Sequence, residues 1–184
     1  MRFILIRHGR TQGNLERRYI GCRTDEPLCP EGIADLARGG CPEADGVFAS
    51  PMLRCVQSAG ILFPGKQPQI IDDLRECDFG EFENRNYAEL RDNPAYQAWL
   101  DSGGEASFPG GEGRSAFSER CVRAFQVAVC NLSDGCYAFV VHGGTIMAIM
   151  ERFARPEGSY YDFQVGNGEG FILNGDGSYE ELKL

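Results

Sequence analysis

Short apolar runs alternate along the chain with stretches whose apolar residues recur at helical spacing. Phe3–Ile6 and Ala138–Val141 are continuously apolar, which is typical of strands buried on both faces of a parallel sheet. Four weaker runs of strand length accompany them: Val47–Ala49, Gln69–Ile71, Phe171–Leu173 and Tyr179–Leu184. The pattern predicts six strands, the last two forming a closing pair.

Helices are predicted between these runs. Ser50 followed by Pro51 is typical of an N-cap and a first helical position, and it predicts a helix that runs to about Leu62. The longest predicted helix, Ser115–Leu132, has one apolar face, made of Phe117, Cys121, Ala124, Phe125, Ala128 and Leu132. The remaining predicted helices are Pro30–Arg38, Tyr87–Arg91, Pro94–Leu100 and Thr145–Phe153.

The alternation of strands and helices predicts an α/β fold, a three-layer sandwich in which helices flank a mainly parallel central sheet. The length of 184 residues suits a single domain, 1–184, and the sequence contains no repeat or low-complexity tract. Five glycines fall within Ser102–Arg114. This density of glycine predicts a mobile connector inside the domain.

The chain is acidic, with 18 Lys and Arg against 27 Asp and Glu and a formal net charge of -9. No cluster of basic residues stands out, so we expect no nucleic-acid partner and no basic membrane-surface helix. An anionic substrate is compatible with this charge, because salt screens surface charges beyond about 8 Å. Two or three cations inside a pocket would outweigh the diffuse negative surface.

The eight cysteines could indicate the disulfide framework of a secreted protein. However, a signal peptide needs about 7–15 apolar residues and a membrane span about 20, and the chain has no such run. No Cys-x-x-Cys pair occurs, and neither histidine has the spacing of a zinc ligand. We therefore expect a cytoplasmic protein with reduced thiols, several of them small core residues, and no membrane contact.

The two histidines occupy equivalent positions in the pattern. His8 and His142 each follow an apolar run, and each precedes a glycine, Gly9 or Gly143. One such histidine is most simply a core or cap residue, but glycine is only 24 of 184 residues, so the repeated pair favours a shared site. Ligands of open α/β sheets bind beyond the carboxyl ends of the strands, where both histidines would lie.

Two arginines are expected at the same edge of the sheet. Arg7 precedes His8, and Arg54 lies one turn into the helix after the second strand. Guanidinium groups match phosphate oxygens in pairs, and glycines let backbone N–H groups approach an anion closely. These residues together predict a phosphate pocket.

A phosphate pocket that contains histidine suggests phosphoryl transfer. A neutral imidazole nitrogen can attack phosphorus and form a phosphohistidine. A carboxylic acid can protonate the leaving oxygen and then activate water. Leu74–Glu83 offers four acidic residues after the third strand, although such a segment by itself is more simply a solvated loop.

These motifs resemble those of the histidine phosphatase superfamily, in the branch that includes cofactor-dependent phosphoglycerate mutases and small phosphatases. Arg7–Asn14 matches the signature Arg-His-Gly-x-Thr/Ser-x-x-Asn, Leu74–Gly80 the acid motif, and Val141–Gly144 the late histidine. Arg54 matches the second arginine, and two other similar segments are Tyr19–Leu28 and Phe108–Glu112. The likeness extends in order over nearly the whole chain and implies a phosphoglycerate mutase-like fold.

The resemblance also implies roles for single residues. His8 would be the phosphorylated nucleophile, and Glu76 the general acid and base. The phosphoryl group and substrate would be held by Arg7, Arg54, His142, Gly9, Thr11, Asn14, Gly21 and Gly143. Neither a metal nor another cofactor is implied, since arginine and histidine supply the positive charge. His142 would become cationic beside bound phosphate, whereas His8 must stay neutral.

Two positions depart from the family pattern. Cys29 stands where members often have threonine, which predicts a weaker helix cap, and Asn84 stands where glycine is common. Neither position falls in the predicted phosphate pocket. These departures therefore bear on substrate loops more than on the chemistry.

Either water or a second hydroxyl could accept the phosphoryl group from His8. The short segment between Glu76 and His142 favours an open site that admits water, so the resemblance implies a hydrolase of phosphomonoesters of small metabolites. Tyr19–Leu28 and Phe79–Glu83 resemble most closely the α-ribazole phosphatases of cobalamin biosynthesis, which implies α-ribazole 5′-phosphate as a substrate. The alternative is a cofactor-dependent phosphoglycerate mutase.

A protein that only binds phosphate is a further alternative, against which the intact His8 and Glu76 argue. The aromatic residues Phe82, Tyr96 and Trp99 could line the leaving-group side of the pocket. Their spacing is more simply that of core residues.

Overall fold

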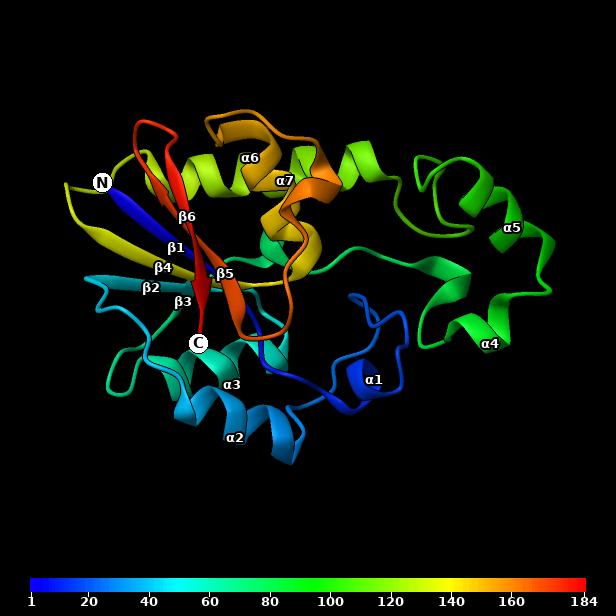
Figure 1. Cartoon of the computed structure of the whole chain (residues 1–184), viewed down its shortest axis with the longest axis horizontal. Coiled ribbons are helices and arrows are strands. Elements are labelled where there is room, and N and C mark those ends of the chain that lie inside the picture. The colour runs from blue at the N-terminus through cyan, green and yellow to red at the C-terminus, as the bar shows by residue number, and fades with distance from the viewer.

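A six-stranded sheet lies between helices in the computed structural model, which describes residues 1–184 (Figure 1). Its strands are β1 (Arg2–Arg7), β2 (Gly46–Ala49), β3 (Gln69–Ile70), β4 (Cys136–Val141), β5 (Glu169–Asn174) and β6 (Tyr179–Lys183). The strand order is β3-β2-β4-β1-β5-β6, with three parallel pairings from β3 to β1 and two antiparallel pairings at β5 and β6. The predicted α/β sandwich is confirmed, and its sheet is mixed.

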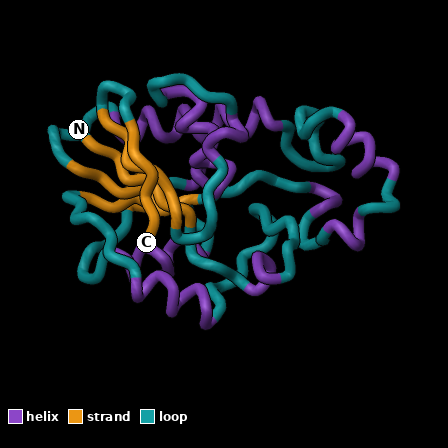
Figure 2. The backbone as a smooth tube through the Cα atoms, in the orientation of Figure 1, coloured by secondary structure: helices purple, strands orange, loops and turns teal.

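Helices cover both faces of the sheet and extend beyond one end of it. The α-helices are α1 (Gln12–Leu15), α2 (Pro30–Arg38), α3 (Leu53–Leu62), α4 (Tyr87–Leu90), α5 (Pro94–Asp101), α6 (Arg114–Val129) and α7 (Gly143–Phe153). Three 3₁₀ turns, η1 (Asp72–Leu74), η2 (Gly80–Phe82) and η3 (Tyr160–Phe163), lie in the connections. Helices α2 and α3 lie on one face and α6 and α7 on the other, while α4 and α5 lie far from the strands (Figures 1 and 2). No helix is both long and apolar enough to cross a lipid bilayer.

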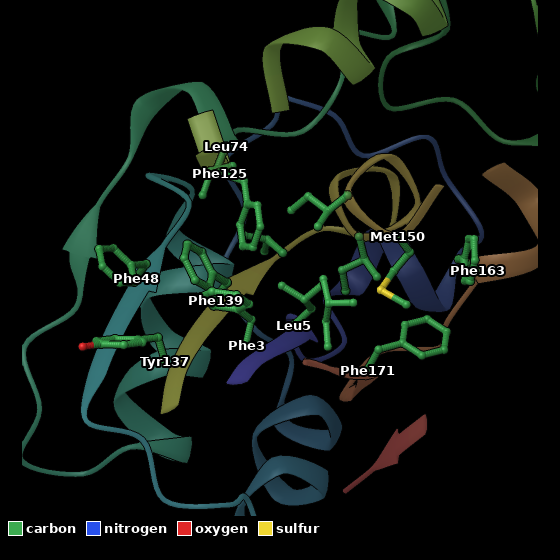
Figure 3. Packing of buried hydrophobic residues seen from close by; sticks show 14 of the residues in the cluster. Phe3, Leu5, Phe48, Leu74, Phe125, Tyr137, Phe139, Met150, Phe163 and Phe171 are labelled. Atoms are coloured by element: carbon green, nitrogen blue, oxygen red, sulfur yellow. The ribbon is translucent and has the colours of Figure 1, made fainter. Parts of the chain in front are cut away.

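The central strands are buried on both faces, which explains their continuously apolar runs. Leu5 belongs to the core on the α6 and α7 side, with Phe139 and Met150 (Figure 3). Ile4 and Ile6, its neighbours on β1, belong to the opposite core, against α2 and α3. All five side chains are fully buried.

A third, smaller core lies under α4 and α5. Phe82 and Tyr96 are buried in it, together with Phe117 of α6, and Trp99 packs against it. Phe82 and Tyr96 are therefore core residues, as their spacing favours. This cluster anchors the segment beyond the end of the sheet, where it forms one wall of the cavity described below.

The register of the central strands places three polar residues at one edge of the sheet. Arg7 on β1 pairs with Val141 on β4, so His8 and His142 leave the sheet side by side. Ala49 on β2 pairs with Val140, so Ser50 leaves it at the same edge.

Helix α3 begins later than predicted. Its first residue is Leu53, whose N–H donates to the side chain of Asp25 at 2.7 Å. The predicted N-cap, Ser50, is buried, and its hydroxyl lies 2.7 Å from Nε2 of His142. The prediction of a cap at Ser50 was wrong. The carboxylate of Asp25, distant in sequence, accepts the first N–H of the helix, and the Ser50 hydroxyl is hydrogen-bonded to His142.

The structure bears on four other local expectations. The connector 102–114 is held by backbone hydrogen bonds, among them Glu112 N–H to the carbonyl of Asp78. Cys29 still caps α2, with its sulfur 3.4 Å from the backbone nitrogen of Gly32. Asn84 has a φ of 56°, the left-handed region that favours glycine, which accounts for glycine being the common family residue there. All eight cysteines are free.

Candidate active site

The two histidines meet at the carboxyl ends of β1 and β4. Their ring centroids lie 5.2 Å apart in an edge-to-face arrangement, and both residues are buried. Nδ1 of His8 lies 2.7 Å from the carbonyl oxygen of Gly9. Because a carbonyl oxygen can only accept, Nδ1 carries the proton, and Nε2 keeps a free lone pair. This tautomer leaves Nε2 of His8 free to act as a nucleophile.

His142 is held from the β2 side of the sheet edge. Its Nε2 lies 2.7 Å from the hydroxyl oxygen of Ser50, and the sulfur of Cys55 lies 3.6 Å from the same nitrogen. Sequence reasoning missed the Ser50 contact, since the Ser-Pro pair there resembles a helix start. Ser50 fixes the orientation of the second imidazole.

Two arginines, the buried Arg54 and the half-buried Arg7, offer unpaired donors beside these rings. Arg54 donates to the carbonyls of Thr24 at 2.9 Å and Gly21 at 3.1 Å, and Arg7 donates to the carbonyl of Val165 at 2.7 Å. The Nε–H group of each arginine has no partner in the protein. Buried donors are normally satisfied, so two unsatisfied guanidinium N–H groups indicate a place for an anion.

Glu76 lies against the same group of residues. It is 9% exposed, and one of its carboxylate oxygens accepts the N–H of Cys77 at 2.9 Å. Burial raises the pKa of Glu76, and the charges of Arg54 and Arg7 offset this only in part. A raised pKa favours the protonated carboxylic acid, the form that can donate a proton.

Burial also determines the protonation of the two histidines. The pKa of His8 lies well below its usual value because of burial, and the charges of Arg54 and Arg7 lower it further. The pKa of His142 is lowered by burial, Arg54 and His8. Both imidazoles are therefore neutral in this structure, and the cationic state of His142 beside phosphate stays a prediction.

A cavity of about 300 Å³ opens onto these groups. At its inner end the lining includes Arg7, His8, Asn14, Glu76 and Gly143. The outer walls are largely aromatic, with Tyr19, Phe79, Trp99, Phe108, Phe117, Tyr160 and Tyr161. Arg54 and His142 do not line the cavity and are fully buried against its inner residues. Five of the predicted site residues thus surround the cavity, and two support them from inside.

Three predicted substrate-binding residues have other roles in the structure. The N–H of Gly9 donates to the hydroxyl of Ser58 at 2.9 Å, so it is not free for an anion. Thr11 is buried and caps α1. A side chain at Gly21 would overlap the carbonyl oxygen of Cys77. None of these three residues lines the cavity. Each contributes to the packing of the site, and their part in binding substrate stays a prediction.

The segment before β5 completes the site, and sequence reasoning missed it. The side-chain amide of Asn167 donates to the carbonyl of His8 at 3.0 Å and to the side-chain oxygen of Asn14 at 3.1 Å. Val165 supplies the carbonyl that holds Arg7. No motif marks this segment, because its contribution depends on β5 lying beside β1.

Comparisons with known proteins support the resemblance to the histidine phosphatase superfamily. Residues 3–184 match the model of the histidine phosphatase superfamily (branch 1). The adenosylcobalamin/alpha-ribazole phosphatase of Escherichia coli (strain K12) is 32% identical over 180 residues, covering 91% of this chain and 87% of that protein. The 2,3-bisphosphoglycerate-dependent phosphoglycerate mutase 2 of Gloeobacter violaceus is 32% identical over 161 residues, covering 80% and 73%.

Solved structures agree with these relatives. A phosphoglycerate mutase from Thermus thermophilus superimposes with a TM-score of 0.78 and 30% identity, over 100% of this chain and 99% of that one. Phosphatases and mutases are thus both among the relatives, so the relatives do not decide which acceptor receives the phosphoryl group. The family match over residues 3–184 and the shared fold show that the chain belongs to the histidine phosphatase superfamily, branch 1.

Proposed function

We propose that the protein hydrolyses phosphomonoesters through a phosphohistidine on His8, with no metal or other cofactor. One observation carries the proposal: a histidine with a free Nε2 lies beside two unpaired guanidinium N–H groups and a carboxyl whose pKa is raised by burial. The protein thereby combines a nucleophile, phosphate ligands and a proton donor.

The first step transfers the phosphoryl group to the protein. The lone pair on Nε2 of His8 attacks phosphorus, and the bond between phosphorus and the ester oxygen breaks. Glu76 gives its proton to the leaving oxygen, and an alcohol departs. The imidazole becomes positively charged as it is phosphorylated, which strengthens the hydrogen bond from Nδ1 to the carbonyl of Gly9.

The second step returns the phosphoryl group to water. The Glu76 carboxylate accepts a proton from water, whose oxygen attacks phosphorus as the bond to Nε2 breaks. Inorganic phosphate leaves, His8 is again neutral, and Glu76 is again protonated. Arg7 holds the phosphoryl oxygens from the cavity wall in both steps, and Arg54 and His142, buried directly behind that wall, stabilise the negative charge that concentrates there.

Asn14 and Gly143 assist from the cavity wall. Gly143 is the first residue of α7, so its N–H has no acceptor within the helix. The position of a side-chain carbon on Gly143 would lie 3.5 Å from Nε of Arg7, which places this backbone beside the free guanidinium donor.

The outer cavity favours an uncharged leaving group. Its two cations are already paired: Arg18 with Glu16 and Glu89, and Arg114 with Glu105 and Glu151. Neither arginine is free for the carboxylate of a phosphoglycerate, whereas the aromatic walls suit a planar apolar group. Hydrolysis of a substrate such as α-ribazole 5′-phosphate, after the name of the Escherichia coli relative, is therefore favoured over the mutase alternative.

A test of the proposal measures phosphate release in the presence of EDTA from a panel that includes α-ribazole 5′-phosphate and an aryl phosphate. Wild type should turn over and form an acid-labile phosphoenzyme, and His8→Ala should do neither. Equal rates for the two proteins would refute the covalent route. Dominant interconversion of phosphoglycerates, dependent on a bisphosphorylated primer, would establish the mutase instead.

The proposal also includes the domain organisation and the cellular compartment of the protein. The continuous sheet that joins both ends of the chain supports residues 1–184 acting as one domain. The eight free thiols support a reducing compartment such as the cytoplasm.

A further inference from the structure

The glycine-rich segment 108–112 packs backbone to backbone against the loop that carries Glu76. Glu112 N–H donates to the carbonyl of Asp78 at 2.9 Å, and Glu81 N–H donates to the carbonyl of Pro109 at 2.8 Å. Side chains at Gly80 or Gly111 would overlap the opposite backbone. The two segments therefore form one unit, which the proposed chemistry does not by itself explain.

Arg120 of α6 joins this unit to the body of the protein. Its Nε and Nη2 donate to the two carboxylate oxygens of Glu112 at 3.0 and 2.7 Å. Its Nη1 donates to the carbonyls of Asp73 at 2.8 Å and Arg75 at 3.1 Å. Arg120 is only 8% exposed, so these bonds are made largely out of water.

The hydrogen bonds of the pair fall on both sides of Glu76. Arg120 holds the carbonyls of Asp73 and Arg75, which precede it. Glu112 accepts the N–H of Asp78, which follows it, at 2.9 Å. The backbone that carries the Glu76 carboxyl is thus fixed at both ends by one ion pair.

We propose that Arg120 and Glu112 are positioning residues that hold the carboxyl of Glu76 at the leaving oxygen. The inference rests on the proposed role of Glu76 as proton donor. It gives a function to Glu112 in the segment Phe108–Glu112, which the sequence marks as similar to the family and of which only Phe108 lines the cavity. Neither residue touches the substrate; the pair acts through the position of Glu76.

The positioning role predicts that the loss of rate depends on the leaving group of the substrate. A nitrophenolate leaves without a proton, whereas an alkoxide needs one from Glu76. A displaced Glu76 should therefore slow phosphorylation of His8 by benzyl phosphate far more than by 4-nitrophenyl phosphate. A general loss of folded protein would slow both by the same factor.

The experiment measures single-turnover phosphorylation of His8 by these two substrates in wild type and in Arg120→Met, Arg120→Lys and Glu112→Gln. Arg123→Met is the matched control, since Arg123 lies on the same helix, is exposed and forms no ion pair. For Arg120→Met we expect a loss of about 10²-fold with benzyl phosphate and less than about tenfold with 4-nitrophenyl phosphate. Arg120→Lys should recover part of the rate, because it keeps the charge but not the paired donors.

A second readout is the pH profile with benzyl phosphate. The charged groups that act on Glu76 are Arg7 on β1, Arg54 on α3 and Arg120 on α6. Removing the Arg120 charge raises the pKa of Glu76 further, so the alkaline limb should move to higher pH in Arg120→Met and stay in Arg120→Lys. Arg123→Met should leave it unchanged.

Each outcome decides between the possibilities. Equal losses with the two substrates, or a loss no larger than that of Arg123→Met, would overturn the positioning role. If thermal unfolding shows that Arg120→Met is not folded, Glu112→Gln gives the same comparison, since it keeps the shape and one acceptor of the side chain. A wild-type protein that forms no phosphohistidine would remove the proposed function and this inference together.

Discussion

The rings of His8 and His142 meet edge to face at 5.2 Å, although 134 positions separate them in the chain. The parallel pairing of β1 and β4, which ends at Arg7 and Val141, brings them together. The carbonyl of Gly9 accepts from Nδ1 of His8 and leaves Nε2 of that ring free, whereas the ring of His142 is held by Ser50. Similar residues at equivalent positions are thus given different hydrogen-bond partners, and we expect different consequences when each is removed.

His8→Ala should abolish turnover and phosphoenzyme formation, since no other nitrogen is placed to attack. His142→Ala should still form the phosphoenzyme, but at a rate lowered by about 10²–10³-fold, the usual cost of losing one donor to a developing charge. Rapid-quench measurement of acid-labile phosphate distinguishes the two. A phosphoenzyme in His8→Ala would assign the nucleophile elsewhere.

The pH dependence follows from the pKa shifts of Glu76 and His8. The pKa of Glu76 is raised by burial, so its acid form persists above the usual range and the rate falls as pH rises through the raised value. The pKa of His8 is lowered by burial, so the acid limb should lie well below 6.5. Rates of benzyl phosphate hydrolysis across the acid and alkaline ranges test this, and Glu76→Gln should lose the alkaline limb.

Ser50→Ala removes the hydrogen-bond partner of His142. A hydrogen bond of this kind contributes about 1 kcal/mol, so we expect the unfolding temperature to fall by about 2–4 °C and kcat/KM to fall about fivefold. Ser133→Ala is a suitable control, because Ser133 bonds only to Tyr137, away from the cavity. A wild-type rate in Ser50→Ala would show that other contacts orient the ring.

The ion pair of Glu105 and Arg114 should exclude anionic leaving groups. Glu105→Gln frees Arg114 in part, since Glu151 remains nearby. The pair is partly exposed and worth at most about 1 kcal/mol, so kcat/KM for 3-phosphoglycerate should rise about two- to fivefold. The value for a neutral aryl phosphate should not change. Equal effects on the two substrates would contradict discrimination by charge.

Substitution by alanine should have different effects at Gly143 and at Gly21. Gly143→Ala has room for the methyl group, whose nearest neighbour is Arg7, so the protein should stay folded while KM rises. Gly21→Ala would overlap the Cys77 backbone and should destabilise the fold by about 1–3 kcal/mol. Urea unfolding and steady-state kinetics of the two variants provide the comparison. Loss of stability in Gly143→Ala would show that this wall is packed more tightly than its contacts indicate.

The strands and the meeting of the histidines could be predicted because local pattern decides them. Continuous apolar runs mark buried strands, and residues that follow parallel strands meet at one edge. The cap of α3 could not be predicted, because Asp25 reaches it from another part of the chain. The partner of the Gly9 N–H could not be predicted for the same reason, because Ser58, which accepts it, lies 49 positions away.

Loop contacts account for the rest of what the sequence did not reveal. Val165 contributes through its carbonyl, which every residue possesses, so its side chain gives no signal. The position of Arg120 in an amphipathic helix is equally compatible with a solvated residue. Only the folded chain distinguishes these residues from their neighbours.

The contacts of Val165 and Asn167 also determine the order in which this site can be assembled during synthesis. They hold Arg7 and His8, which are made 158 and 159 residues earlier. A nascent chain can form β1 and β4 while the segment that leads into β5 is still inside the ribosome. Such a chain holds Arg7 and His8 loosely until residues 165–167 have emerged and lie beside them.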